Sequence, residues 1–431
     1  MKIRRFKAVT VTLLCSVGLL LLLGAGPSPE RTPEIPEISR QINEFTIDLL
    51  KHDADNKNAP FNSILSPQSV FHGLAMSYIA SAGETGREMA AVCHFPDDKK
   101  LLLQSLTDLR RQLQSTAKHK RIDVSIANSL WMDETYAKFR DEYIDEVQET
   151  FDASLYYVKF AQKARACKYI NKWVSDKTRG KIQKSVSPED FNSRSEPGII
   201  DEPALVSISA VYFKADWNTR FDKSSTRKLP FLVNASRTEE TMMMHQRSQL
   251  PYSENDKVKF LEIPYIDGVY SMYVILPKEL ISIRELTGII NTGMLVDLKR
   301  NAFTREVDVL LPKFEIKKHL AVKNTLSGMG VKSAFDKQKA DFDKMIIKNP
   351  EAFRIYISEI YHDAWIDVHE EGTEAAAATT TVHYSFGCSA PYSFPPEQFH
   401  ADHPFIFMIV HNQSRSILFT GWISSPEKLE Q

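Results

Sequence analysis

The sequence predicts an α+β fold. Segments with helical spacing of apolar residues fill most of the chain up to about residue 184, and strand-like segments dominate from Leu205 onward. The strands do not alternate with helices as they do in parallel α/β sheets, and there is no internal repeat, GxGxxG motif or phosphate-binding loop. With 431 residues, 43% of them apolar, the chain can bury a large core, and length alone would suggest two or three domains.

The N-terminal segment is predicted to lie outside this fold. Residues 1–26 have the pattern of a signal peptide, because four basic residues precede an apolar run from Ala8 to Leu23 and small residues follow before Pro27. We expect export with cleavage, and the alternative is an uncleaved membrane anchor. Residues 27–36 are predicted to form a flexible, proline-rich leader, and the folded domain is expected at residues 37–431.

The helices are predicted from apolar residues three or four positions apart and from capping residues. Ser66 followed by Pro67 predicts a helix start, because serine can cap a free N–H group and proline lacks one. Thr85 and Glu88 have the spacing of a capping box. Helices are therefore expected at residues 38–50, from Ser66, from Thr85, and at residues 102–113, 139–152, 164–184 and 318–329.

Strands are predicted where apolar residues alternate or form short continuous runs. These segments are Ile122–Leu130, Leu205–Phe213, Val258–Ile263, Ser271–Leu276, Val307–Leu311, Phe353–Ile357, Ala364–Val368, Phe405–Val410 and Ile417–Ile423. Turns are expected at Asp267-Gly268 and at Asn412-Gln413. The last two strands are apolar on both faces and are therefore expected inside the structure.

Composition and motifs argue against several classes of function. The formal net charge of −1 gives no reason to expect a nucleic-acid partner. The absence of HExxH, CxxC and GxSxG motifs leaves no sign of a metal, a cofactor or an enzyme active site. One of the four cysteines, Cys15, lies in the signal segment, so three remain, and at least one thiol has no disulfide partner in the same chain.

One basic cluster is a candidate site for a polyanion such as a glycosaminoglycan. It consists of Arg110, Arg111, Lys118, Lys120 and Arg121. The alternative is an ordinary solvated helix end, because basic and apolar positions alternate in this part of the chain.

The most unusual composition lies between Glu370 and Thr381. Two glutamates and Gly372 lead into a run of small residues, mostly alanine and threonine, with no large side chain and no proline. Such a segment has too little apolar area to form a core, yet its side chains fit a crowded strand. We interpret it as a loop that can become a strand. The alternative is a flexible linker or a short surface helix.

This stretch resembles the hinge of the reactive-centre loop of the serpins, a family of protease inhibitors. The hinge residues are Glu370, Glu371, Gly372, Thr373, Glu374, Ala375, Ala376, Ala377, Ala378 and Thr379. Other blocks resemble serpin motifs in the same order along the chain: Asn62–Ser69, Ile170–Val174, Val211–Trp217, Leu311–Phe314, His403–Phe405 and Leu418–Gly421. The resemblance implies one domain with three β-sheets, eight or nine helices and an exposed reactive-centre loop at about residues 370–396, and it replaces the domain count suggested by length.

The resemblance also implies a mechanism. A serpin is a suicide substrate: the target serine protease cleaves the loop and forms an acyl-enzyme, and the loop then inserts into the central sheet and traps the covalent complex. Alternate residues of the inserted strand point inward, and these would be Thr373, Ala375, Ala377, Thr379 and Thr381, all of them small. We therefore expect an inhibitor that is a monomer, and the alternative is a non-inhibitory carrier or chaperone-type binding protein.

The scissile bond is predicted from its distance to the hinge. Counting from Gly372 as in the family gives Phe386-Gly387, and counting back from Pro395-Pro396 gives Tyr392-Ser393. We prefer Phe386-Gly387, because the length of the inserted segment must match the length of the strands in the sheet. Both candidates are aromatic, which implies a chymotrypsin-like or subtilisin-like target with an apolar pocket.

Further residues are carried over from the resemblance. Lys313 matches the lysine that pairs with Glu370, Trp217 lies beside the point where the sheet opens, and a polar cluster under the parting strands contains Ser66, Ser69 and His362. The position that holds an asparagine in the family is Ser209 here. Because serine makes fewer hydrogen bonds, we expect the strands to be held together less tightly. The sheet should then open more easily, and we expect polymerisation on heating. Cys388, two residues after Phe386, is an exposed thiol whose oxidation or pairing would block the protease, or else an indifferent loop residue.

Overall fold

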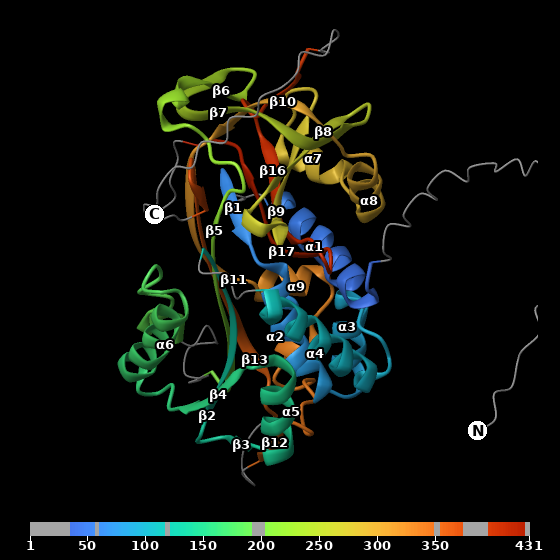
Figure 1. The fold of residues 1–431 in the computed structure, drawn as a ribbon. Helices are drawn as coiled ribbons and strands as arrows, with labels where there is room; N and C mark the ends of the chain where they lie inside the picture. Colours follow the sequence, from blue (N-terminus) through green and yellow to red (C-terminus); the bar gives the residue numbers. More distant parts are fainter. Residues whose placement is uncertain are drawn as a thin grey trace, which may run out of the picture. The chain divides into compact units, whose positions relative to one another are not determined.

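The structure is a computed structural model that describes residues 35–56, 60–116, 121–191, 203–348, 354–373 and 395–426. The chain divides into Met1–Glu34 and one compact unit, Ile35–Gln431, and all the described residues lie in the second (Figure 1). Within the described residues, no helix is long and apolar enough to cross a membrane.

The described part contains nine α-helices and three β-sheets, which confirms the α+β prediction and the counts that the resemblance implies. The helices are α1 (Glu37–Asp55), α2 (Pro67–Ile79), α3 (Gly83–Cys93), α4 (Lys99–Thr116), α5 (Asp141–Phe151), α6 (Lys163–Lys177), α7 (Ile283–Ile289), α8 (Thr292–Arg300) and α9 (Lys323–Met329).

The largest sheet has nine strands and holds the two apolar C-terminal strands at its interior. Its order is β1 (Asn62–Leu65), β17 (Ser416–Ile423), β16 (Phe405–His411), β9 (Tyr270–Pro277), β8 (Val258–Pro264), β7 (Arg237–Glu254), β10 (Phe303–Pro312) and β15 (Glu397–His400), with β6 (Arg227–Asn234) beside β7. Every residue of β16 and β17 is buried, as predicted from their apolar composition.

The second sheet has six strands and is the one that the hinge enters. Its order is β11 (Phe314–Ala321), β13 (Ile357–His369), β14 (Gly372–Thr373), β5 (Leu205–Asp216), β2 (Ile122–Asp133) and β4 (Ser154–Val158). A third sheet pairs β12 (Ile346–Lys348) with β3 (Ala137–Phe139). Below the two residues of β14, β13 and β5 pair directly with each other in parallel, so the six-stranded sheet is closed there.

The six-stranded sheet is covered on both faces. One face packs on the nine-stranded sheet through a shared apolar core, and α2 lies behind the sheet at its middle. On the other face lies α6, which packs against β5 and whose apolar residues belong to one hydrophobic cluster with residues of β2, β5 and β13. Figure 1 shows α6 on one side of this sheet and α1 to α4 on the other. Any strand added between β13 and β5 would therefore lie beneath α6.

Helix α2 begins where the sequence predicted. It starts at Pro67, and the Ser66 hydroxyl accepts a hydrogen bond from the Ser69 N–H over 3.4 Å. All thirteen residues of α2 are buried, because the helix runs between the sheets and its neighbouring helices. At its middle, Gly73 leaves room for the side chains of Ser207 and Ser209 on β5.

Several predicted elements were wrong in their bounds or their type. The capping box at Thr85 does not exist: α3 begins at Gly83, the Thr85 hydroxyl accepts from the Asp341 N–H, and Glu88 accepts from the Lys332 N–H. The predicted helix at 318–329 forms only from Lys323. Residues 314–321 form strand β11 instead, because they pair with β13.

The remaining differences concern strands, one helix end and two helices that were not predicted, α7 and α8. Residues 354–356 are not a strand, and β13 begins at Ile357. Helix α6 ends at Lys177, before the predicted residue 184. The sequence analysis also missed β6 and the long strand β7, because several buried positions of β7 carry polar residues, among them Glu239, Thr241 and Gln246.

Candidate functional site

The first residues of the hinge are already part of the six-stranded sheet. Gly372 pairs with Asp216 of β5 and with His369 of β13, while Thr373 pairs with Ala215 and Val368. β14 runs antiparallel to both neighbours, so the chain turns back at Glu370-Glu371 and enters the sheet between them. The first two residues of a new central strand are thus in place.

Only glycine fits at position 372. A Cβ atom there would lie 2.2 Å from the Ala215 carbonyl oxygen and 2.6 Å from the Asp216 Cα, well inside van der Waals contact. The neighbouring Thr373 side chain is fully buried, and its hydroxyl is 2.8 Å from the hydroxyl of Tyr265. The sequence analysis placed Gly372 in the hinge, and the structure adds a close backbone approach.

Two ion pairs stabilise the turn at the start of the hinge. Lys313 Nζ lies 3.0 Å from Glu370 Oε2, and the Thr226 hydroxyl donates to Glu370 Oε1 over 2.8 Å. Burial alone would raise the pKa of Glu370, but a backbone N–H and the bonds from Lys313 and Thr226 outweigh it and hold the pKa below its ordinary value. Glu371 pairs with Lys223 over 2.6 Å.

Trp217 connects the turn to the sheet. Its backbone N–H donates to the Glu371 carbonyl and its indole N–H donates to the His369 carbonyl, each over 2.9 Å. The indole stacks on Tyr265, with ring centroids 4.4 Å apart. Trp217 was identified from the sequence, whereas Tyr265 and Thr226 were missed, because their role depends on segments far apart in the chain.

The polar cluster lies under the closed ladder between β13 and β5. The Ser66 N–H donates to His362 Nε2 over 2.9 Å, and the Ser69 hydroxyl donates to Asn128 Oδ1 over 3.2 Å. In the strand register, Ser209 lies opposite both Asn128 and His362. The sequence analysis missed Asn128. The only signal was an amide in an otherwise apolar stretch of β2.

The cluster contains buried polar atoms that lack partners. Among the described residues, nothing forms a hydrogen bond with Ser207 Oγ, Ser209 Oγ or His362 Nδ1. Burial, with a smaller effect of His319, lowers the pKa of His362 to about 3, so the ring is neutral at pH 7. Because Nε2 accepts from Ser66, Nδ1 carries the proton and is a donor without an acceptor.

Three of the five residues of the basic cluster lie within the described residues. Arg110 donates to the carbonyl oxygens of Glu149 and Thr150 at the end of α5, and Arg121 lies 3.6 Å from Asp216. Arg111 lies 3.8 Å from Asp108. Lys118, Lys120, residues Glu374–Thr379, Phe386, Gly387, Cys388, Tyr392 and Ser393 lie outside the described residues.

Two of the cysteines lie within the described residues. Cys93 and Cys167 are buried free thiols. No group of three or more histidine, cysteine or acidic side chains in the described part is arranged to hold a metal ion.

Gly372→Ala is expected to expel β14 from the sheet. The added methyl group would overlap the β5 backbone, so the strand pairing and its hydrogen bonds would be lost. Each backbone hydrogen bond contributes about 0.5–1.5 kcal/mol net, and we expect the amides of Thr373 and Trp217 to exchange with deuterium at least about tenfold faster. Hydrogen exchange followed by mass spectrometry measures this.

Gly288→Ala is the matched control, because no atom lies within 4 Å of a Cβ at that position in α7. Exchange at the hinge should be unchanged in this variant. Equal exchange at Thr373 in both variants would contradict the close approach.

The stability of the native state is expected to fall as the pH falls from about 6.5 toward 4. Burial lowers the pKa of His72 and of His411 to about 4 and that of His362 to about 3. Between these values and 6.5 the unfolded chain binds protons that the folded chain does not. Each such imidazole therefore removes up to about 1.4 kcal/mol per pH unit.

One histidine acts in the opposite direction. Burial lowers the pKa of His319, but the hydrogen bond and charge of Asp363 outweigh it and leave the pKa raised, which favours the folded state at low pH. Three imidazoles against one still give a net loss. Melting temperatures measured from pH 7 to pH 4.5 should decrease, and His72→Phe should reduce the slope. A flat profile would show that these histidines protonate in the folded state.

Known proteins are similar to this chain in sequence and in fold. The family model described as Serpin (serine protease inhibitor) matches residues 40–426. Leukocyte elastase inhibitor of Xenopus laevis is 33% identical over 403 residues, which cover 90% of this chain and 99% of that protein. Plasminogen activator inhibitor 2 of Homo sapiens is 33% identical over 427 residues, which cover 89% of this chain and 98% of that protein.

A solved structure agrees with these relatives. Serpin48 of the insect Tenebrio molitor, a highly specific serpin, superposes with a TM-score of 0.76 at 29% identity, and the match covers 90% of this chain and 98% of that chain. The family model spans the described unit almost from end to end. The chain therefore belongs to the serpin family.

Proposed function

We propose that this chain is an exported suicide inhibitor of chymotrypsin-like serine proteases. The observation that carries this proposal is the position of β14: Gly372 and Thr373 already pair with both strands between which the cleaved loop would insert. The relatives named as inhibitors of leukocyte elastase and of plasminogen activator support the same class of function. The signal-peptide pattern of residues 1–26 supports export.

The register of β14 specifies how the loop would insert. Because β14 and β5 are antiparallel, each residue after Thr373 would pair one residue nearer the start of β5, so that His383 would face Leu205. Phe386 lies just beyond that point, whereas Tyr392 would leave a longer segment outside the sheet. This register therefore supports Phe386-Gly387 as the scissile bond.

In the same register, threonines of the inserted loop would lie next to buried polar side chains of β5 and β13. Thr379 would lie between Ser209 and His362, and Thr381 would lie opposite Ser207. Their hydroxyl groups share the face of Thr373, which points into the core. An unsatisfied buried polar group costs about 1–3 kcal/mol, so hydrogen bonds from the inserted threonines would favour insertion.

The proposed chemistry begins as ordinary proteolysis. The protease serine oxygen bonds to the Phe386 carbonyl carbon, the Phe386–Gly387 bond breaks, and the Gly387 amine leaves with a proton. Insertion of the loop then carries the acylated protease away from its original position before water hydrolyses the ester. This chain supplies the substrate and the inserting strand, and it performs no catalysis itself.

Incubation with chymotrypsin is expected to give a covalent complex that survives SDS. Mass spectrometry of the released C-terminal fragment should show a peptide that begins at Gly387. Thr373→Arg places a charge at a fully buried position, so this variant should be cleaved without forming the complex. Glu374→Arg is the control, because the next residue of a strand points to the other face.

Two results would overturn the proposal in different ways. Clean cleavage at Phe386 without any complex would remove the inhibitory function. A complex whose released fragment begins at Ser393 would retain the function and move the scissile bond to Tyr392.

A further inference from the structure

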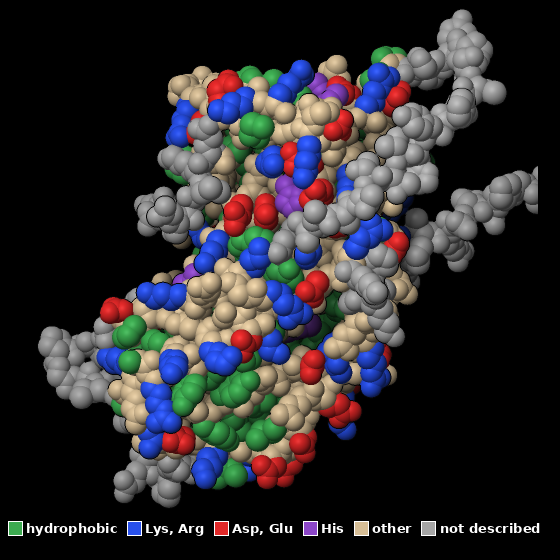
Figure 2. Space-filling model, turned by 60° about the vertical axis from the view of Figure 1, so that its left-hand side comes forward, with side chains coloured by type: hydrophobic (Ala, Val, Ile, Leu, Met, Phe, Trp, Pro, Cys, Tyr) green, Lys and Arg blue, Asp and Glu red, His purple; other side chains and the backbone are tan. Residues whose placement is uncertain are grey.

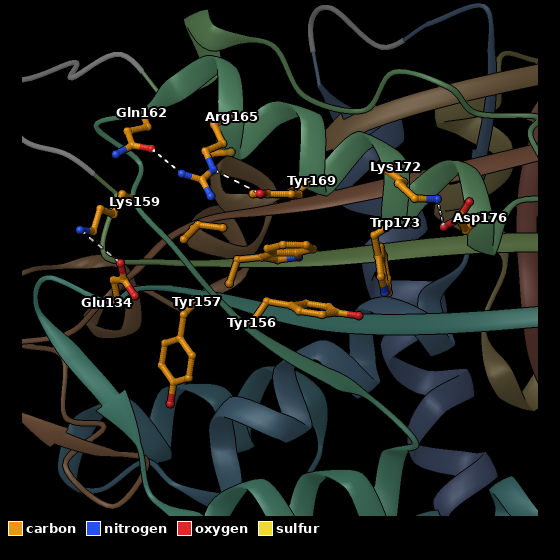
Figure 3. Close-up of a pocket in the computed structure, with 13 residues that line it drawn as sticks. Glu134, Tyr156, Tyr157, Lys159, Gln162, Arg165, Tyr169, Lys172, Trp173 and Asp176 are labelled. Atoms are coloured by element: carbon orange, nitrogen blue, oxygen red, sulfur yellow. Dashed lines mark hydrogen bonds and ion pairs between the residues drawn. The ribbon is translucent and has the colours of Figure 1, made fainter.

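A separate pocket lies between the edge strand β4 and helix α6. It has a volume of about 600 Å³ and opens to solvent. Figure 3 shows Tyr156 and Tyr157 on the strand side of the pocket and Arg165, Tyr169 and Trp173 on the helix side. On the face turned forward in Figure 2, hydrophobic side chains gather among Lys and Arg side chains at the height of these two elements.

The walls of the pocket are aromatic. The indole of Trp131, on β2, stacks on the Tyr156 ring with centroids 4.3 Å apart and an interplanar angle of 25°. Trp173 meets Trp131 edge-on, with centroids 6.5 Å apart. Tyr169, at the mouth, is 47% exposed although it is a large ring. Flat aromatic walls bind planar apolar groups well.

One cation in the wall of the pocket has no carboxylate partner. The Arg165 guanidinium donates to Gln162 Oε1 over 3.4 Å and to the Tyr169 hydroxyl over 3.2 Å, and among the described residues it contacts no carboxylate. A guanidinium whose partners are all neutral favours a ligand that carries an acid group.

The two carboxylates that line the pocket are already paired. Lys159 lies 3.3 Å from Glu134, and Lys172 lies 2.8 Å from Asp176. The remaining charge is therefore that of Arg165, and it is positive.

We propose that this pocket binds a flat aromatic ring that carries one acid group. The ring lies against the aromatic walls, and the acid accepts hydrogen bonds from the Arg165 guanidinium. An arginine–carboxylate contact of this kind is charge-assisted and is about twice as strong as a neutral hydrogen bond.

A ligand in this position connects α6 to the edge of the sheet. The apolar face of α6 also packs on residues of β5 and β13, including Ile208 and Trp365. A strand inserted between β5 and β13 requires α6 to move, and a ligand that binds only the unmoved helix opposes that movement by mass action. Loop insertion becomes slower when the pocket is filled. This consequence rests on the proposed function, but binding does not.

Calorimetry with 2-naphthoate tests the site directly. We expect saturable binding of one naphthoate per chain and at least about tenfold weaker binding of the neutral analogue 2-naphthalenemethanol. Arg165→Met should weaken naphthoate binding by about the same factor.

Lys168→Met is the matched control. It removes one positive charge from an exposed position of the same helix that does not line the pocket, so naphthoate should bind as it does to the unmodified chain. Equal binding of the acid and the alcohol, or equal losses in Arg165→Met and Lys168→Met, would overturn the proposed site. Absence of any binding would overturn it as well.

The effect on insertion has its own measurement. With saturating naphthoate, more molecules of inhibitor should be cleaved per molecule of chymotrypsin trapped, and Arg165→Met should be insensitive. An unchanged ratio in the presence of demonstrated binding would refute the connection between the ligand and α6. If the chain traps no protease, calorimetry still decides whether the site exists.

Discussion

The central constraint in this protein is the direct pairing of β5 with β13. At one end of this pairing, the first hinge residues already pair with both strands. Gly372 and Thr373 occupy the gap at one end, and from Trp365–Tyr212 downward the two strands share their backbone hydrogen bonds. A longer strand can enter only if this ladder separates. Because insertion would replace one strand pairing with two, the native state can persist as a kinetic state rather than the most stable one.

Some side chains around this ladder stabilise the closed sheet, whereas others leave buried polar atoms without hydrogen-bond partners. Glu370 and Glu371 fix the turn through Lys313 and Lys223, and Trp217 donates to the backbone on either side of it. Beneath the ladder, Ser207, Ser209 and His362 each leave a buried polar atom without a partner among the described residues. Unsatisfied groups at the place where strands must part lower the barrier to opening and reward a polar strand that enters.

Sequence reasoning found the parts of this arrangement that are local. Ser66-Pro67 marked the start of α2, the apolar runs marked β16 and β17, and the small residues after Gly372 marked the hinge. It failed where distant segments decide the structure. Thr85 and Glu88 look like a capping box but bind the segment near Asp341 and Lys332, and residues 318–321 form a strand because β13 lies beside them. Asn128, Tyr265 and the pocket under α6 became visible only once the strands were placed.

The melting temperature before and after loop cleavage tests the central claim most directly. If the cut loop completes the sheet, the cleaved chain should melt more than about 10 °C above the intact one, whereas 1 kcal/mol shifts the melting temperature of a domain of 150–250 residues by only about 2–4 °C. A cleaved chain that melts at the same temperature as the intact chain, or below it, would show that the loop does not insert.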